Sequence, residues 1–185
     1  SGLAAVPAGL ALLLVQQGAK FAQCRPRLRY IEIGSAPMPL EHKRRLMELL
    51  PDTRICMHYG LTEASRCTFI EFHSAAHKLE SIGRPTPNVE VRIVAPDGDE
   101  ARPGRSGAIW VRGRMVMQGY FDNPELTGRT LRAGWLDTGD WGHADAEGYL
   151  YLEGREKELI NVGGLKVAPL EVEKHINAFP GVLDS

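Results

Sequence analysis

Residues 30–60, YIEIGSAPMPLEHKRRLMELLPDTRICMHYG, contain two short apolar runs on either side of a segment with helical periodicity. The alternation in residues 30–33 predicts a strand, residues 39–50 an amphipathic helix, and residues 54–58 a second strand. Two strands joined by a helix of this length form a βαβ unit. The sequence therefore predicts a parallel sheet in this part of the chain.

Further elements are predicted on both sides of this unit. Upstream, an apolar stripe over residues 3–17 predicts a helix that ends at Gly18. Downstream, the 20 glycines and 12 prolines of the chain are concentrated beyond residue 80, which is typical of short strands joined by tight turns. These strands are expected at residues 89–94, 107–112 and 149–152. A hairpin turning at Gly163 and Gly164, and a helix over residues 169–178, are expected near the end.

The predicted fold class is α/β, in a mixed α+β arrangement. A βαβ parallel-sheet portion is followed by a small antiparallel β-barrel-like subdomain and then by the start of a small α+β C-terminal domain. The expected boundaries are residues 1–80, 81–154 and 155–185.

The composition narrows the classes of function. With 185 residues and a formal net charge of −1, the chain lacks the positive charge that binding to nucleic acid or to an anionic membrane requires. The three cysteines show no C-x-x-C spacing, which favours reduced thiols and a cytoplasmic protein. The most apolar stretch, residues 6–15, is too short for a transmembrane helix.

Two motifs follow the predicted parallel strands. Residues 34–37 (GSAP) follow the first strand, and residues 58–63 (HYGLTE) lie at the end of the second. Ligands of such sheets bind beyond the carboxyl ends of the strands. Tyr59 could stack on a base, Thr62 could contact a phosphate, and Glu63 could hold Mg²⁺. Alternatively, Tyr59 packs, and Thr62 and Glu63 only begin a helix.

The segment Trp135-Leu136-Asp137-Thr138-Gly139-Asp140 offers carboxylates on what is expected to be a rigid turn. A carboxylate placed in this way can accept hydrogen bonds from a ribose diol. Arg155, in the charged run GREKE, could bind ribose or phosphate oxygens. An ordinary Asp-rich β-turn and a solvated charge run are the alternatives. Asp137-Thr138-Gly139 is also the triplet of aspartic proteases, and a single triplet would require a homodimer.

His73 and His77 are four residues apart, a spacing that could place both on one helix face as a metal pair. No cysteine accompanies them, and Glu71 and Glu80 nearby are ordinary surface residues. Surface histidines are the favoured interpretation.

The order of the motifs is more specific than any one of them. They are residues 34–37 (GSAP), 59–63 (YGLTE), 81–85 (SIGRP), 107–113 (GAIWVRG), 117–120 (MQGY), 134–140 (GWLDTGD), 154–160 (GREKELI) and 164–173 (GLKVAPLEVE). This series resembles the adenylate-forming (AMP-binding) superfamily, which includes acyl-CoA synthetases, coumarate-CoA ligases, luciferases and peptide-synthetase adenylation domains. The acyl-CoA synthetase and coumarate-CoA ligase branch is the most similar, and the resemblance covers nearly the whole chain.

The resemblance implies an ATP-dependent ligase. A fatty or aryl carboxylic acid would attack the α-phosphate of Mg-ATP to give acyl-AMP and pyrophosphate, and CoA would then take the acyl group. ATP or AMP, Mg²⁺ and CoA are the implied cofactors and co-substrates. No nucleic acid partner is implied, and self-association is left open.

The resemblance also assigns roles to residues. The implied nucleotide-binding residues are Gly34, Ser35, Ala36, Pro37, His58, Tyr59, Gly60, Thr62, Asp140 and Arg155. Thr62 and Glu63 would be catalytic, Glu63 as the Mg²⁺ ligand, and Asp140 rather than Asp137 would be the functional carboxylate. Lys157 would lie at the hinge between two domains, and Gly164 where CoA passes.

The resemblance further implies that this chain is an internal fragment. The family's phosphate loop should lie before residue 1 and its catalytic lysine beyond residue 185, so we expect the chain to be inactive alone. Coumarate-CoA ligases carry lysines where this chain has Asn161 and Gly163. A fragment of a peptide-synthetase-type adenylation domain is the alternative within the same family.

Overall fold

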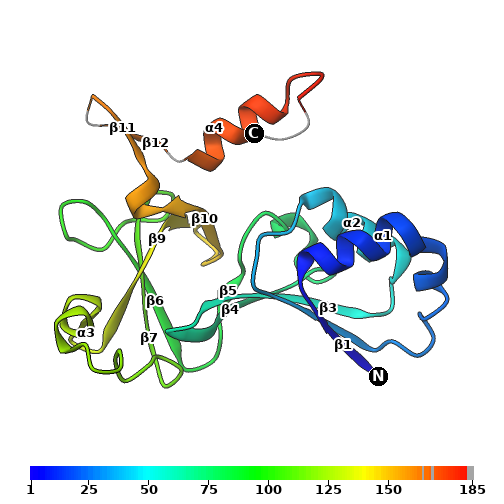
Figure 1. The fold of residues 1–185 in the computed structure, drawn as a ribbon, viewed down its shortest axis with the longest axis horizontal. Coiled ribbons are helices and arrows are strands. Elements are labelled where there is room, and N and C mark those ends of the chain that lie inside the picture. The colour runs from blue at the N-terminus through cyan, green and yellow to red at the C-terminus, as the bar shows by residue number, and fades with distance from the viewer. Residues whose placement is uncertain (164, 168, 183–185) are drawn as a thin grey trace. The chain divides into compact units, whose positions relative to one another are not determined.

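The computed structural model describes residues 1–163, 165–167 and 169–182. The chain divides into two compact units. The first unit combines Ser1–Val89 with Gly113–Met117, and the second combines Glu90–Arg112 with Gln118–Ser185. Each unit has its own sheet (Figure 1).

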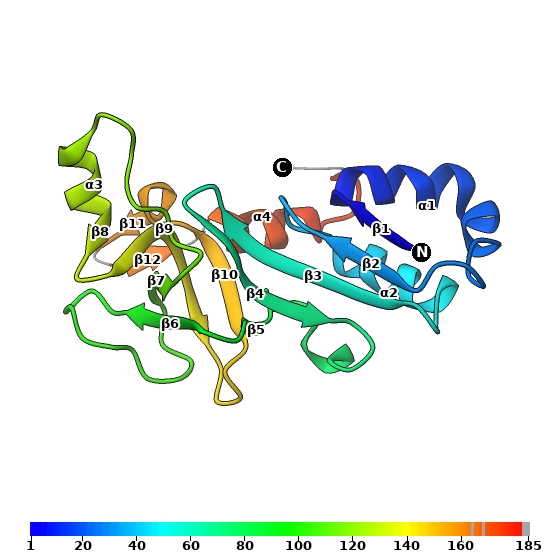
Figure 2. The same ribbon diagram turned by 90° about the horizontal axis from the view of Figure 1, so that it is seen from below.

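The first unit contains a five-stranded sheet in the order β1-β2-β3-β4-β5. Its strands are β1 (Gly2–Ala5), β2 (Tyr30–Ile33), β3 (Arg54–Leu61), β4 (Ala64–Glu71) and β5 (Arg84–Pro85). The first three strands are parallel, and β4 and β5 extend the sheet in antiparallel fashion (Figure 2). The predicted βαβ unit is confirmed.

Helices α1 (Pro7–Ala22) and α2 (Leu40–Leu49) connect consecutive parallel strands and lie on the same side of the sheet (Figure 1). Adjacent strands joined by crossovers of one hand place their helices on one face. The helices cover a strongly apolar core. Its fully buried side chains include Leu10, Ile31, Ile33, Leu46 and Ile55.

Two predictions in this unit are wrong in detail. Residues 2–5 form the edge strand β1, since they pair with β2, and the helix begins only at Pro7. Helical backbone is found as far as Ala22, but it is interrupted at Gln17 (φ −136°, ψ 20°), where two helical stretches meet at a kink beside the predicted end at Gly18. A glycine costs a helix only about 1 kcal/mol, so it does not have to end one.

The motif at residues 58–63 lies in a β-hairpin, not at the start of a helix. Strand β3 continues to Leu61, and the chain turns back at Thr62 and Glu63 into β4. The ladder is irregular between Tyr59 and Leu61. At Gly60 a β-carbon would lie 2.5 Å from the backbone nitrogen of Arg66, so only glycine permits this close approach.

The second unit is built on an antiparallel sheet in the order β10-β9-β7-β6. Its strands are β6 (Val89–Val94), β7 (Gly107–Gly113), β9 (Trp135–Ala144) and β10 (Leu150–Arg155), with the short β8 (Leu131–Arg132) paired to β9 and preceded by helix α3 (Pro124–Thr130). The predicted antiparallel, barrel-like character is confirmed. Residues 135–140 lie in β9, so the predicted rigid turn is wrong there.

Tryptophan and arginine side chains stack within this unit. The guanidinium of Arg92 lies 5.0 Å from the ring centroid of Trp110 and 4.3 Å from that of Trp135. Arg112 lies 4.6 Å from the Trp135 ring centroid. Trp110 also packs in a cluster with Trp141. Such cation–π contacts hold neighbouring strands together through their side chains.

The last elements of the chain follow β10. They are the short 3₁₀ helix η2 (Glu156–Glu158), the antiparallel hairpin of β11 (Ile160–Val162) and β12 (Leu165–Val167), and helix α4 (Pro169–Asn177). The predicted hairpin and helix are present. In the part of the chain that the structure describes, every helix is too short or too polar to cross a membrane.

Candidate functional site

The predicted site residues of the first unit meet at one edge of its sheet. Strands β2 and β3 are parallel neighbours with Ile33 opposite Met57, so the loop at residues 34–37 begins beside His58. A β-carbon at Gly34 would lie 2.2 Å from Cε1 and 2.3 Å from Nε2 of His58. Any larger residue at this position would therefore have to displace the imidazole that occupies this space.

A carboxylate that the sequence analysis did not single out completes this group. Oε1 of Glu32, on β2, lies 2.6 Å from Nε of Arg66 and 3.2 Å from Nδ1 of His58. Burial lowers the pKa of His58; the carboxylate of Glu32 opposes this shift and Arg66 adds to it. The net lowering of the pKa favours the neutral imidazole. Glu32 could have been found as the one charged residue in the apolar run at residues 30–33.

The loop after β2 has a strained backbone. Ser35 has a positive φ of 79°, a conformation that non-glycine residues rarely adopt. The side chains of Ser35, Ala36 and Pro37 are exposed, whereas Met38 is buried and anchors the loop. Strain held in an exposed loop beside a packed strand is common where a chain binds a ligand.

The hairpin turn between β3 and β4 carries the two polar residues of the motif. Thr62 is exposed and Glu63 is half-buried. The carbonyl oxygen of Glu63 accepts a hydrogen bond of 2.7 Å from the backbone nitrogen of Met117. Tyr59, on β3, is half-buried opposite Thr68. The hydroxyl of Thr62 and the carboxylate of Glu63 therefore lie at the tip of a hairpin whose backbone is held by hydrogen bonds.

The second unit brings together the predicted pair of Asp140 and Arg155. Asp140 on β9 and Arg155 on β10 are partners across the ladder, and Oδ1 of Asp140 lies 3.1 Å from Nε of Arg155. Asp140 is 5% exposed, whereas the Arg155 side chain is 54% exposed. Nη1 of Arg155 also donates to the carbonyl oxygen of Thr138 at 3.1 Å.

A bulge in β9 positions the carboxylate. Asp137 pairs with Trp110, and Trp141 pairs with Ala108, so residues 138–140 face the single residue Ile109 of β7. Thr138 holds this bulge: its hydroxyl donates to the carbonyl oxygen of Ile109 at 2.7 Å and accepts from the backbone nitrogen of Asp140 at 3.1 Å. Thr138 itself was not among the predicted site residues.

Asp137 is placed differently from Asp140. Its Oδ1 accepts a hydrogen bond of 3.0 Å from the backbone nitrogen of Gly139, which has a φ of +69°. Asp137 thus shapes the bulge, and Asp140 is the carboxylate beside the guanidinium. A carboxylate with an adjacent guanidinium can accept hydrogen bonds from a diol while the guanidinium donates to neighbouring oxygens.

Two predicted residues lie near the end of the chain. Lys157 is exposed within η2, two residues after Arg155. Gly164 lies outside the described residues, and its neighbour Gly163 has a positive φ of 60° at the hairpin turn. The hinge role of Lys157 and the CoA role of Gly164 stay predictions.

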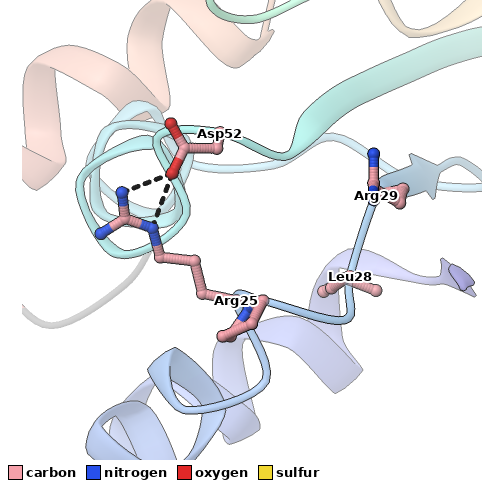
Figure 3. A pocket seen from close by; sticks show the side chains of 5 residues that line it. Arg25, Leu28, Arg29 and Asp52 are labelled. Carbon is pink, nitrogen blue, oxygen red and sulfur yellow. Dashed lines mark hydrogen bonds and ion pairs between the residues drawn. The ribbon is translucent and has the colours of Figure 1, made fainter.

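Two further features lie apart from these groups. Within the described ranges, no three His, Cys, Asp or Glu side chains gather as a metal site. A pocket of about 510 Å³ lies at the amino ends of β2 and β3, the opposite edge of the sheet from residues 34–37. Its lining includes Arg25, which is paired with Asp52 (Nε to Oδ2, 2.9 Å), and Arg29 (Figure 3).

Comparison with known proteins gives consistent matches. The profile of the AMP-binding enzyme family matches residues 1–121. The 4-coumarate–CoA ligase-like protein 9 of Arabidopsis thaliana is 37% identical over 161 residues, which cover 85% of this chain and 29% of that protein. A long-chain-fatty-acid–CoA ligase of Bacillus subtilis is 41% identical over 142 residues, covering 76% of this chain and 25% of its own length.

Solved structures agree with these matches. The O-succinylbenzoate coenzyme A synthetase of Bacillus subtilis, in complex with AMP, superimposes with a TM-score of 0.86 at 32% identity over 100% of this chain and 37% of that protein. The same enzyme has been solved with ATP and a magnesium ion, again with a TM-score of 0.86 and 32% identity. The chain spans between a quarter and two fifths of the length of these proteins.

Proposed function

Because the chain belongs to the AMP-binding enzyme family, we propose that it forms part of an AMP-forming acid–thiol ligase, an acyl-CoA synthetase. The activity is proposed for the whole protein, since the chain spans only 29% and 25% of two relatives named as CoA ligases. The family assignment does not favour an aspartic protease. The CoA ligases among the relatives favour CoA over a carrier-protein thiol as the acceptor.

The proposed reaction has two steps. A carboxylate oxygen of the acid attacks the α-phosphorus of ATP, pyrophosphate leaves, and an acyl-AMP forms. The sulfur of CoA then attacks the acyl carbon, AMP leaves, and the thiol proton is released. Such transfers depend on positioning and on neutralisation of charge more than on covalent catalysis by the protein.

The observation that carries the proposal is the pairing of Asp140 with Arg155. We propose that the Asp140 carboxylate accepts hydrogen bonds from the ribose hydroxyls of the nucleotide. Arg155 would donate from its exposed side to ribose or phosphate oxygens. The bulge held by Thr138 fixes the carboxylate before the nucleotide binds, which lowers the entropy cost of recognition.

We propose complementary roles in the first unit. Tyr59 would stack on adenine, and residues 34–37 with His58 and Gly60 would line the nucleotide. Thr62 would donate to a phosphate oxygen. Glu63 would hold Mg²⁺, which supplies neutralisation of phosphate charge when bound. A single carboxylate at a hairpin tip fits this ion, because Mg²⁺ keeps most of its ligands from water and phosphate.

The acid is proposed to be a fatty or aryl carboxylic acid, as the resemblance implies. Because the three cysteines are an odd number without C-x-x-C spacing, which favours reduced thiols, we propose that the protein works in the cytoplasm.

Calorimetric titration of the 185-residue chain with AMP tests the Asp140 proposal. Asp140→Asn should weaken AMP binding about tenfold or more, the size expected for loss of a hydrogen bond to a charged group. The 2′,3′-dideoxy analogue should bind the unaltered chain about as weakly as AMP binds the variant. Asp137→Asn is the matched control and should leave AMP affinity within about twofold, because its amide oxygen still accepts from Gly139. Equal AMP affinity in Asp140→Asn and the unaltered chain would contradict the ribose role.

A further inference from the structure

Strand β10 reaches Arg155 through a bulge. Leu152 pairs with Gly142, whereas Gly154 pairs with Trp141 and Arg155 with Asp140. Glu153 is the extra residue on β10. In a regular antiparallel ladder that continued from the pair of Leu152 and Gly142, Arg155 would face Gly139. The bulge therefore makes Asp140 the partner of Arg155.

Two glycines make this bulge sterically possible. At Gly142 a β-carbon would lie 2.1 Å from the carbonyl oxygen of Tyr151, so β10 approaches β9 where there is no side chain. Gly154 has a φ of +151°, which favours glycine, at the exit of the bulge. Glycines permit a bulge, but they do not hold one in place.

The side chain of the extra residue is fixed from two directions. Oε1 of Glu153 accepts a hydrogen bond of 2.7 Å from the hydroxyl of Ser106, which immediately precedes β7. The same oxygen lies 2.6 Å from Nδ1 of His143 on β9. The His143 ring stacks on Tyr151 of β10, with centroids 5.0 Å apart and planes 10° from parallel. Three consecutive segments of the sheet are thus tied to the bulged residue.

We infer that Glu153 is a positioning residue for the nucleotide site. Held by Ser106 and His143, it keeps the bulge in β10 that sets Arg155 opposite Asp140. The inference rests on the proposed role of the pair of Asp140 and Arg155 in nucleotide binding. It concerns three residues, Glu153, Ser106 and His143. Glu153 immediately precedes the motif GREKELI at residues 154–160, and the other two lie outside it. None of the three is proposed to contact the nucleotide.

The side-chain Nε–Hε signal of Arg155 in the NMR spectrum of the chain tests this directly. In the unaltered chain the ion pair should slow hydrogen exchange at this group. Glu153→Ala, and separately the double variant Ser106→Ala with His143→Phe, should speed the exchange about tenfold. The phenylalanine keeps a flat ring on Tyr151 and removes both ring nitrogens, including the Nδ1 that contacts Glu153. Glu147→Ala, at the turn of the same hairpin, is the matched control and should leave the exchange unchanged.

If Glu153 and its partners only stabilised the fold, their substitution would lower the midpoint of thermal unfolding without a selective effect on the Arg155 signal. We therefore expect the Arg155 signal to change in folded variants, while backbone signals of β7 stay in place. An unchanged Arg155 signal in both Glu153→Ala and the double variant would overturn the inference. If Glu153→Ala does not fold, the double variant decides, because it leaves Glu153 present.

AMP titration of the same samples separates this inference from the proposed function. Weaker AMP binding in Asp140→Asn and in the Ser106 and His143 double variant supports both. Weaker binding in Asp140→Asn alone, with an unchanged Arg155 signal in both Glu153→Ala and the double variant, overturns only the positioning role of Glu153. A changed Arg155 signal with AMP affinity insensitive to Asp140→Asn overturns the ribose site and leaves the positioning of Arg155 by Glu153 supported.

Discussion

The imidazole of His58 lies so close to Gly34 that a β-carbon at residue 34 would be 2.2 Å from Cε1. This contact joins the middle of β3 to the first residue of the loop after β2. It makes the identity of residue 34 depend on a residue 24 positions later in the chain. The loop proposed to line the nucleotide is therefore shaped by packing within the first unit.

Gly34→Ala should destabilise the first unit, because the His58 ring must move to admit the methyl group. We expect the free energy of unfolding to fall by about 1–3 kcal/mol, the usual cost of overpacking. Urea denaturation followed by circular dichroism measures it. Gly18→Ala is the control: it meets no atom within 4 Å and should be neutral or stabilising. In a His58→Ala background the cost of Gly34→Ala should largely vanish; a cost that persists there would mean that the ring is not its cause.

Lys43 should make stability depend on alkaline pH. Its side chain is 5% exposed, its Nζ donates to the carbonyl oxygen of Leu79 at 2.5 Å, and burial lowers its pKa to about 8, opposed by Glu80. Between pH 8 and the ordinary lysine value of 10.5 the unfolded chain binds the proton that the folded chain has released. The free energy of unfolding should therefore rise with pH across this window.

The comparison of Lys43→Met with Lys20→Met isolates this effect. Lys43→Met should remove the rise between pH 8 and pH 10 in chemical denaturation, whereas Lys20→Met, on the exposed face of α1, should keep it. The same rise in Lys43→Met as in the unaltered chain would assign it to another group.

Glu63→Gln should reduce the Mg²⁺ dependence of ATP binding. If the carboxylate holds the ion, its loss should weaken ATP binding in saturating Mg²⁺ about tenfold, and should leave AMP binding without Mg²⁺ unchanged. Calorimetric titration with each nucleotide, with and without Mg²⁺, gives both values. Glu41→Gln on α2 serves as the control, since Glu41 is exposed in the first turn of that helix. Equal losses for ATP and AMP would point to a distorted hairpin and not to a lost metal ligand.

The 185-residue chain should not catalyse ATP–pyrophosphate exchange by itself. The resemblance places the phosphate loop and the catalytic lysine outside these residues, so nucleotide can bind here without adenylation. Exchange of radiolabelled pyrophosphate into ATP, with fatty and aryl acids supplied, is the measurement. Exchange clearly above a protein-free blank would contradict the fragment interpretation.

The parallel half of the fold could be predicted because its signals are local. Residues 30–33 alternate, and residues 39–50 have helical spacing, so each element is specified by its own sequence. The exposed loop at residues 34–37 followed from the position of the strand. Lys43 shows the limit of such reasoning, since its burial depends on the carbonyl of Leu79, 36 residues away.

The second unit was harder to predict, because bulges hide its strands. Residues 137–140 carry turn-forming Asp and Gly, yet they lie in β9, where the extra residues are held by the hydroxyl of Thr138. No local sequence pattern marks Glu153 either, and only the pairing of β9 with β10 reveals it as an extra residue in the strand. The identities of Asp140 and Arg155 were predicted from the motif, whereas their register was not predictable.

All three tryptophans, Trp110, Trp135 and Trp141, lie in the second unit, and two of them stack on Arg92. The long helices α1 and α2 lie in the first unit. Intrinsic fluorescence therefore reports chiefly on the second unit, and far-ultraviolet ellipticity is weighted towards the first. If the two unfolding curves do not coincide, the units unfold as separate cooperative blocks, each with its own midpoint. The position of three indoles thus provides a label-free means of assigning any variant's effect to one half of the chain.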